Sequence, residues 1–366
     1  MSFKSKTSAF IGLDRLRALV TNSIAIDMGA AATVIYEKGR GVVVDEPSLI
    51  AVNTISGEVM AIGQEAQKMY GREARDVTVI APMANGVVAD FESTNQMLAH
   101  FARKARSSLS HFTRRAFMSV LSGVTPVERR ALLSAAQHAR IGRVWMIEEG
   151  LAAAFGTGVD PADPRASAIV NIGGGTTSVV VVANGAIVHA TAERIGGSHI
   201  NAAIINHVRR HRGLAIGAQT AERLKLQIAS ATVPINLSED TSVSGRDVLT
   251  GTPSAVDITA GEIYPVAQEV VRKIVEGIAR TLTELAPEVS GDIYERGLVL
   301  IGGGSLFGGL DDFLRDSTKL PVRIADEPRY AVVRGLAQLF DKPQLLRHLN
   351  LNEPPTLLDA ESQSIE

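Results

Sequence analysis

The sequence predicts an α/β protein in which two related domains enclose a central cleft. A chain of 366 residues is longer than one compact core usually fills, so two domains are expected. Segments with strand and helix patterns alternate along most of the chain, which is typical of α/β folds. A strand–loop–strand pattern with a small-residue loop occurs twice, and a repeated pattern indicates a duplicated unit.

The clearest copy of this pattern lies at residues 168–185. An apolar run ends at Asn171 and Ile172, a polar glycine-rich loop follows, and a second apolar run leads to Asn184-Gly185, a dipeptide typical of tight turns. Glycines lack Cβ atoms, so their backbone N–H groups can approach an anion closely, and threonine hydroxyls can add donors. An ordinary glycine-rich hairpin is the alternative. The predicted phosphate-binding loop consists of Gly173, Gly174, Gly175, Thr176 and Thr177.

The second copy lies upstream, between Ser23 and Tyr36. Its first strand again ends near a polar residue, Asp27, which is equivalent to Asn171. The loop that follows consists of Gly29, Ala30, Ala31, Ala32 and Thr33. Two such loops, far apart in the chain, predict that one nucleotide is held from both sides in a cleft between the halves.

Composition excludes several classes of function. The 37 Lys and Arg residues nearly balance the 39 Asp and Glu residues, giving a net charge of −2 without a basic block, so nucleic acid is not an expected partner. The absence of cysteine excludes disulfides and thiolate chemistry and agrees with a reducing cytoplasm. The eight histidines are scattered without the spacing of a metal site.

No apolar run reaches the roughly 18 residues that a membrane-spanning helix needs. Residues 1–21 nevertheless mix aromatic, aliphatic and basic side chains, which predicts a short amphipathic helix on a membrane surface, with a loosely docked terminus as the alternative. Leu109 and Phe112 interrupt an otherwise polar loop and are candidates for a further membrane or partner contact.

The first half is expected to begin with the hairpin and a small β-rich lobe. Thr125, Pro126 and Glu128 have the residue types of a capping box with proline at the first helical position, so they predict a helix start. The expected strands are 42–44, 48–52, 59–62, 116–122 and 144–147, and the expected helices are 64–70, 93–107 and 151–155, with a loop at 83–90.

The segment from Asp160 to Pro164 contains two prolines and is predicted to be a linker and hinge between the halves. Gly302, Gly303 and Gly304 follow an apolar strand and open a helix, which predicts a third close approach to a ligand. The other expected helices are 201–210, 220–229, 260–285 and 330–339, the expected β-structure covers 233–243 and 321–324, and a polar tail begins near 351.

Several longer phrases, in order along the chain, point to a family. They include DEPSLIAV from Asp45, TPVERRALLSAAQ from Thr125, NIGGGTT from Asn171, TAERLK from Thr220 and LIGGGSLFGGLDDFL from Leu300. With these motifs the chain from about Ser23 to Phe340 resembles the MreB family of bacterial actins, within the actin/Hsp70/hexokinase ATPase superfamily.

The resemblance implies an actin-like ATPase fold, with two RNase H-like domains, each carrying a smaller inserted subdomain, and a nucleotide in the central cleft. The implied division is 22–38, 76–150 and 326–346 for subdomain IA, 39–75 for IB, 151–190 and 257–325 for IIA, 191–256 for IIB, and 347–366 for a tail. Residues 1–21 would associate with the membrane.

The resemblance also implies a site for ATP and Mg²⁺. Glu149 would orient the attacking water, assisted by Asp27, and Asp27 and Asn171 would hold Mg²⁺ through its waters. Glu222 and Lys225 would contact the ribose and base. The implied nucleotide contacts are Gly29, Ala30, Ala31, Ala32, Thr33, Asn171, Gly173, Gly174, Gly175, Thr176, Thr177, Glu222, Arg223, Leu224, Lys225, Gly302, Gly303, Gly304, Ser305 and Leu306.

The chain departs from the family pattern at the site. Ala30 and Ala32 replace polar residues, Asn171 replaces an aspartate, and Gly150 replaces a proline. Ser198 and Asn201 stand where acidic residues are usual. Because Asn171 carries no charge, we expect ATP binding to persist and hydrolysis to be slow, with Asn171→Asp raising the rate. A divergent paralogue is one interpretation.

The resemblance favours a cytoplasmic cytoskeletal protein at the inner face of the cytoplasmic membrane. It would stack head to tail into filaments, with a role in cell shape and with membrane proteins of cell-wall elongation as partners. A non-polymerising nucleotide switch or chaperone-like ATPase is the alternative. An Hsp70 would need a substrate domain, for which about 26 residues after Phe340 are too few. A sugar kinase would need a hydroxyl-binding motif, and we find none.

Overall fold

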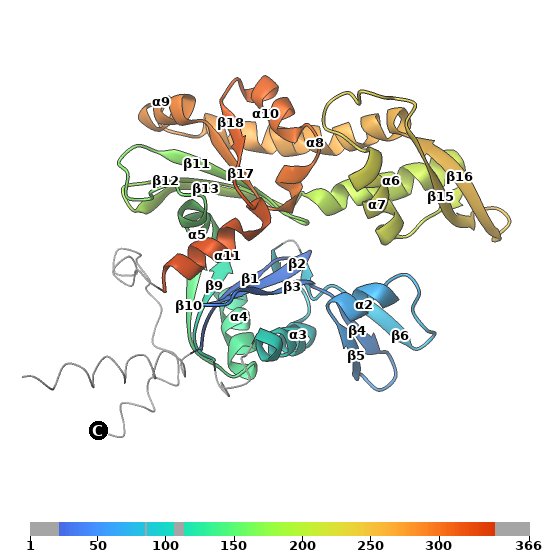
Figure 1. The fold of residues 1–366 in the computed structure, drawn as a ribbon, viewed down its shortest axis with the longest axis horizontal. Helices are drawn as coiled ribbons and strands as arrows, with labels where there is room; N and C mark the ends of the chain where they lie inside the picture. Colours follow the sequence, from blue (N-terminus) through green and yellow to red (C-terminus); the bar gives the residue numbers. More distant parts are fainter. Residues whose placement is uncertain (1–21, 85, 106–112, 341–366) are drawn as a thin grey trace, which may run out of the picture.

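The computed structural model describes residues 22–84, 86–105 and 113–340. Two five-stranded sheets form the centres of two halves, which lie one above the other in Figure 1. The first sheet contains β1 (Asn22–Met28), β2 (Ala32–Glu37), β3 (Gly41–Pro47), β9 (Thr113–Val120) and β10 (Ile141–Glu148). The second contains β11 (Ser167–Ile172), β12 (Thr177–Ala183), β13 (Ala186–Glu193), β17 (Leu298–Ile301) and β18 (Val322–Ile324).

The two sheets have the same topology. Their strand orders are β3-β2-β1-β9-β10 and β13-β12-β11-β17-β18. In each sheet the first three strands in the chain form an antiparallel meander. The last two strands then add in parallel on the other side of the first strand. Identical topology in two segments of one chain confirms the predicted two-domain α/β fold.

Helices cover the outer face of each sheet, as Figure 1 shows. The first sheet packs on α3 (Phe91–Ala105) and α4 (Pro126–His138), and the core between them includes the buried Phe101 and Leu132. The second sheet packs on the long helix α8 (Ala260–Thr283), through residues such as Ile274 and Val181. Helices α9 (Pro287–Arg296) and α10 (Leu310–Thr318) complete this outer layer.

Each half carries a small lobe. The lobe of the first half has a sheet of β4 (Ile50–Asn53), β5 (Val59–Ile62) and β6 (Val77–Ile80), with α2 (Gln64–Met69) against it. The lobe of the second half has a sheet of β14 (Leu214–Ala215), β15 (Asp240–Asp247) and β16 (Pro253–Thr259), with α6 (Gly197–Arg212) and α7 (Ala218–Ile228). Strand β3 pairs with β2 in the large sheet, so the small sheet begins after Pro47, later than the expected residue 39.

Two short helices, α5 (Glu149–Gly156) and α11 (Ala331–Gln338), lie between the two sheets. They share a hydrophobic cluster with residues of both sheets, among them Ala25 from β1 and Ile169 from β11. The two helices approach backbone to backbone at two glycines. A Cβ atom on Gly156 would lie 1.8 Å from the carbonyl oxygen of Ala331, and one on Gly335 would lie 1.7 Å from that of Ala152. The halves are therefore joined by a tight helix pair.

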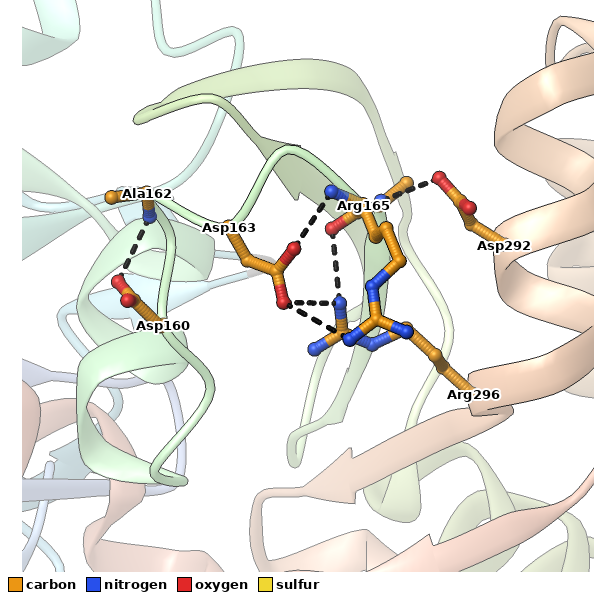
Figure 2. A network of polar contacts seen from close by, with 7 residues as sticks. Asp160, Ala162, Asp163, Arg165, Asp292 and Arg296 are labelled. Atoms are coloured by element: carbon orange, nitrogen blue, oxygen red, sulfur yellow. Dashed lines mark hydrogen bonds and ion pairs between the residues drawn. The ribbon is translucent and has the colours of Figure 1, made fainter.

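The segment from Asp160 to Pro164 does not link the halves, so the predicted hinge was wrong. Figure 2 shows that the Asp163 carboxylate accepts a hydrogen bond from Arg296 at 2.8 Å and another from the Arg165 N–H at 2.8 Å. The carbonyl oxygen of Asp163 accepts from the Asn184 N–H in the β12–β13 turn. All of these contacts lie within the second half, because the crossing between halves is made earlier, by α5.

Most expected elements are present, with shifted ends. The capping box at Thr125 is confirmed, because its hydroxyl accepts from the Glu128 N–H and the Glu128 side chain accepts from the Thr125 N–H. Asn184 and Gly185 both have positive φ, as a tight hairpin turn requires. Residues 233–239 do not join the expected β-structure, because Pro234 lacks a donor and Asn236 forms a local turn to Ser238. The expected loop at 83–90 contains the short strands β7 (Met83–Ala84) and β8 (Val87–Val88).

Candidate functional site

Strand alternation brings Asp27 and Asn171 to the layer between the halves. Successive side chains of a strand point to opposite faces. In β1, Ala25 belongs to the cluster between the halves, and Asp27 is the next residue on that face. In β11, Ile169 belongs to the same cluster, and Asn171 is the next residue on its face. The duplicated strands therefore direct their equivalent polar residues toward one another.

Glu149 is the first residue of α5, the helix between the two sheets. It lies close to both Asp27 and Asn171. The Asn171 side-chain amide donates a hydrogen bond to Glu149 Oε1. On the other side, the Ser119 hydroxyl at the end of β9 donates to Asp27 Oδ1 at 2.7 Å. Two carboxyl groups, one amide and one hydroxyl thus meet where the two sheets approach.

The electrostatics of this group favour protonated carboxyls. Burial, and secondarily the nearby Asp27, raise the pKa of Glu149 to about 8, against a smaller lowering by a hydrogen bond from Ser178. Burial also raises the pKa of Asp27, although the hydrogen bond from Ser119 opposes this. Carboxyl groups with raised pKa values can release a proton and become charged when a cation or a water molecule enters, and such groups are typical of reactive sites.

The two predicted phosphate loops have the same turn. In the first, the Gly29 N–H donates to the carbonyl oxygen of Ala32 at 3.0 Å. In the second, the Gly173 N–H donates to that of Thr176 at 2.8 Å. Within the described residues, no acceptor is found for the loop amides of Ala30, Ala31, Gly174, Gly175 and Thr176. These amides remain available for an anion.

The two loops touch each other. A Cβ atom on Gly174 would lie 2.6 Å from the Cβ of Ala31. The second loop is also buttressed by the N-terminus of α6, where the N–H groups of Gly197 and Ser198 donate to the carbonyl oxygens of Gly173 and Gly174 at 3.0 and 2.8 Å. These hydrogen bonds occupy the carbonyl oxygens of Gly173 and Gly174 and do not use the N–H groups of the loop.

Two of the predicted threonine donors face away from the site. Thr33 is fully buried and its hydroxyl pairs with that of Ser48 at 2.9 Å. Thr177 is also buried and its hydroxyl donates to the carbonyl oxygen of Ile195 at 2.8 Å. The expected donor role was wrong for both side chains. Thr33 is paired across the strands with Met28, and Thr177 with Ile172, and both partners are core residues. Because directly paired residues project from the same face of a sheet, each threonine points into a core and not toward the site.

Helix α7 places Glu222 and Lys225 beside the second loop. Lys225 Nζ is 2.7 Å from Glu222 Oε2 and 3.4 Å from the carbonyl oxygen of Gly197. Asn201 of α6 donates to the same Glu222 oxygen at 2.5 Å. Leu224 is fully buried in the core of the second half, so its side chain cannot face a ligand, whereas Arg223 is exposed.

The third glycine loop closes over the end of β11. Gly302 has a positive φ of 81°, and a Cβ on it would lie 2.2 Å from Asn171 Oδ1. The 3₁₀ turn η1 (Gly303–Leu306) follows, and within it Ser305 is buried with its hydroxyl donating to the carbonyl oxygen of Gly302. The Ser305 hydroxyl is therefore already paired within the loop, whereas Gly303 and Leu306 are exposed.

Four polar residues near the site were given no role by the sequence motifs: Ser48, which lies in the DEPSLIAV phrase, and Ser119, Ser178 and Gln219. Ser48 braces the first loop by donating to the carbonyl oxygen of Gly29 at 2.7 Å. Gln219 of α7, in the lobe of the second half, donates to the carbonyl oxygens of Gln67 and Tyr70 at the end of α2, in the lobe of the first half, the latter at 3.2 Å. The alternation of side chains along β9 and β12 could have predicted that Ser119 and Ser178 face the site. Ser48 and Gln219 could not be found in this way, because they bind backbone atoms of other segments of the chain.

The overall architecture is that of actin-like proteins. MamK in a double helical filament superposes with a TM-score of 0.72 at 19% sequence identity, covering 88% of this chain and 99% of that chain. MreB5 of Spiroplasma citri bound to AMPPNP superposes with a TM-score of 0.83 at 31% identity, covering 90% and 99%. Two equivalent halves, with loops that face each other across a layer of polar groups, thus define an actin-like fold.

Sequence comparison identifies the family. The MreB/Mbl protein family model matches residues 21–348. The chain is 40% identical over 328 residues to the cell shape-determining protein MreB of Escherichia coli (strain K12), covering 88% of this chain and 94% of that protein. It is 35% identical over 323 residues to the cell shape-determining protein Mbl of Bacillus subtilis (strain 168), covering 88% and 97%. The chain belongs to the MreB/Mbl family.

Proposed function

We propose that this protein is a cell-shape cytoskeletal protein that binds ATP in its central cleft and assembles head to tail into filaments. The observation that carries the proposal is the contact of two equivalent loops, Ala31 against Gly174, with unpaired amides on both sides. A nucleotide held by both loops binds both halves at once, so its presence sets their relative position. The MreB5 structures with AMPPNP and ADP support a nucleotide in this cleft.

Each group at the site has a role in this proposal. The amides of the two loops bind the phosphates, and Glu222 and Lys225 bind the ribose and base side. Gly303, Gly304 and Leu306 contact the adenosine. Glu149 orients a water molecule for attack on the γ-phosphorus and accepts its proton, while the bond to the bridging oxygen breaks and ADP leaves with the electron pair. The four subdomains of the family would enclose this site.

The residues fit a Mg²⁺ ion that is held mainly by phosphate and water. Among the described residues no cluster of three or more acidic or histidine side chains forms a metal site by itself. Asp27 lies two residues before the first loop, and it would bind such an ion through its waters, as Mg²⁺ prefers. The ion would neutralise charge that develops on the phosphates.

The filament proposal is tested by nucleotide-dependent assembly. We expect pelleting, with filaments in electron micrographs, in Mg²⁺ and ATP but not without nucleotide. Ala31→Leu should abolish both nucleotide binding and pelleting, because the larger side chain meets Gly174. Ala162→Leu adds the same bulk at an exposed site in the second half and should change neither. A chain that stays monomeric at micromolar concentration with ATP, Mg²⁺ and anionic lipid would refute the proposal.

We also propose that the filaments lie on the inner face of the cytoplasmic membrane, where membrane proteins of cell-wall elongation are the expected partners. No helix in the described ranges is long and apolar enough to cross a membrane. The predicted contacts are residues 1–21, Leu109 and Phe112, which lie outside the described residues. Weak insertion at each protomer would be multiplied along a filament. Deleting residues 2–20 and changing Leu109 and Phe112 to serine should abolish sedimentation with anionic liposomes, and unchanged sedimentation would refute this proposal.

A further inference from the structure

The Glu149 carboxylate is held by donors from two neighbouring strands. Asn171 of β11 donates its amide to Glu149 Oε1, and the Ser178 hydroxyl of β12 also hydrogen-bonds to Glu149. Asn171 and Ser178 are directly paired across the antiparallel β11–β12 ladder. Directly paired residues project from the same face of a sheet, so the two donors form a fork that belongs entirely to the second half.

The other end of the Asn171 amide faces away from this carboxylate. Its oxygen, Oδ1, is buried without a hydrogen-bond partner and lies against Gly302. An amide offers a donor on one side and an acceptor on the other, and a carboxylate neighbour attracts the donor side. Glu149 therefore sets the orientation of the Asn171 amide, whose nitrogen faces the Glu149 oxygen. In this arrangement the oxygen of Asn171 is not directed at the shared space of Asp27 and Glu149.

We propose that Asn171 and Ser178 are positioning residues that hold Glu149 for the attacking water, and that Asn171 does not serve as a water-mediated ligand of Mg²⁺. This inference rests on the proposed ATP hydrolysis. The metal is then placed by the phosphates and by Asp27, whose own donor is Ser119. Asn171 supplies a hydrogen-bond donor and no charge, and Glu149 is the group that receives the hydrogen bond.

The inference reverses the expectation drawn from charge alone. An ionised aspartate at position 171 cannot donate to Glu149, and it would place a third carboxyl group beside Glu149 and Asp27. Asn171→Asp should therefore lower kcat instead of raising it. Asn171→Ala should lower it by a similar factor, because both changes release the Glu149 carboxylate, whereas Ser178→Ala removes only one of two donors.

The experiment separates positioning from metal binding by steady-state kinetics over a range of Mg²⁺ concentrations. We expect Asn171→Ala and Asn171→Asp to lower kcat at least about tenfold, and Ser178→Ala about threefold, which corresponds to roughly 1.4 and 0.6 kcal/mol. The KM for ATP and the half-saturating Mg²⁺ concentration should stay within about twofold of wild type. Ser119→Ala is the matched variant, because it removes a buried donor from the metal-side carboxylate and should raise the half-saturating Mg²⁺ concentration. A higher kcat for Asn171→Asp, or a raised Mg²⁺ requirement for Asn171→Ala at unchanged kcat, would overturn the inference.

A second measurement does not depend on turnover. In the nucleotide-free protein, the loss of Tm caused by Asn171→Ala should be at least halved when Glu149 has already been changed to alanine, because the two side chains share one hydrogen bond. Fully additive losses would overturn the inference. A wild-type chain without ATPase activity would instead refute the proposed hydrolysis, so the two failures are distinguishable.

Discussion

The two phosphate loops have the same turn but are supported by different elements. The first loop, from Gly29 to Thr33, is supported by Ser48, whose N–H donates to the carbonyl oxygen of Ala31 at 3.1 Å and whose hydroxyl binds the carbonyl oxygen of Gly29 and the hydroxyl of Thr33. The second loop, from Gly173 to Thr177, is supported by the N-terminus of α6, where the N–H groups of Gly197 and Ser198 and the Ser198 hydroxyl donate to its carbonyl oxygens.

This difference bears on the glycines of the second loop. The N-terminus of α6 approaches that loop closely, since a Cβ on Gly196 would lie 2.5 Å from the carbonyl oxygen of Gly173. A Cβ on Gly174 would instead lie 2.6 Å from the Cβ of Ala31, so the first loop carries a methyl group where the second loop needs a glycine. One loop geometry can therefore be reached from two sequences, and what the duplication has kept is the turn and its free amides.

The largest expected effect comes from crowding the second loop where it meets α6. Gly196 is the N-cap residue of α6, and a Cβ there would lie 2.5 Å from the carbonyl oxygen of Gly173. Gly196→Ala should destabilise the fold by about 3 kcal/mol and weaken binding of a fluorescent ATP analogue at least about tenfold. Gly217 is the matched control, because it is the N-cap residue of α7 and has open space around its Cβ position. Equal effects of Gly196→Ala and Gly217→Ala in denaturant unfolding would contradict this explanation.

The next effect concerns the carboxyl between the loops. Burial raises the pKa of Glu149 from 4.5 to about 8, so between these values the folded chain holds a proton that the unfolded chain has lost. Stability of the nucleotide-free protein should therefore fall as pH rises from about 4.5 to 8, with a slope of at most about 1.4 kcal/mol per pH unit from this group, and level off above.

Glu149→Gln should reduce this slope, because glutamine does not titrate. Asp27, whose pKa is also raised by burial, leaves a slope in the same direction. Unfolding midpoints measured across this pH range provide the test. An unchanged slope in Glu149→Gln would assign the effect to other groups.

The two phosphate loops and their neighbours also show how much of the candidate site could be predicted from the sequence. The strand periodicity, the two loops and their polar neighbours are local patterns, so Asp27, Asn171 and the glycines were predictable. The Thr33 and Thr177 hydroxyls were misjudged because a motif gives residue types without the register that turns each side chain inward. The contacts of Ser48 with Gly29 and of Gln219 with α2 depend on packing between segments distant in sequence. The predicted hinge at Asp160–Pro164 failed for the same reason, since Arg296 holds the loop from far along the chain.

A smaller effect is expected at the side-chain support of the first loop. Ser48 is fully buried, and Ser48→Ala would leave the carbonyl oxygen of Gly29 and the hydroxyl of Thr33 without this partner. The cost should be about 1.5 kcal/mol of folding free energy. Ser198→Ala is the matched change in the second half, because the exposed Ser198 hydroxyl also donates to a loop carbonyl oxygen, at 2.7 Å. Its cost should be below about 0.5 kcal/mol, since water can replace an exposed donor, and the reverse ranking in thermal unfolding would contradict the comparison.

The smallest expected effect lies where the small lobes of the two halves meet. Gln219 donates to two carbonyl oxygens at the end of α2 in the other half, in an exposed position where each hydrogen bond has a modest net value. Removing them by Gln219→Ala should ease opening by roughly 0.6 kcal/mol, so release of a fluorescent nucleotide in stopped flow should be about threefold faster. Gln227→Ala, an exposed change on the same helix, should leave release unchanged. Because the chain has no cysteine, the pair Gln219→Cys and Tyr70→Cys can be oxidised without competing thiols. If Gln219 closes the cleft, this cross-link should slow release well below the wild-type rate, whereas release that is equally fast before and after oxidation would show that the cleft opens elsewhere.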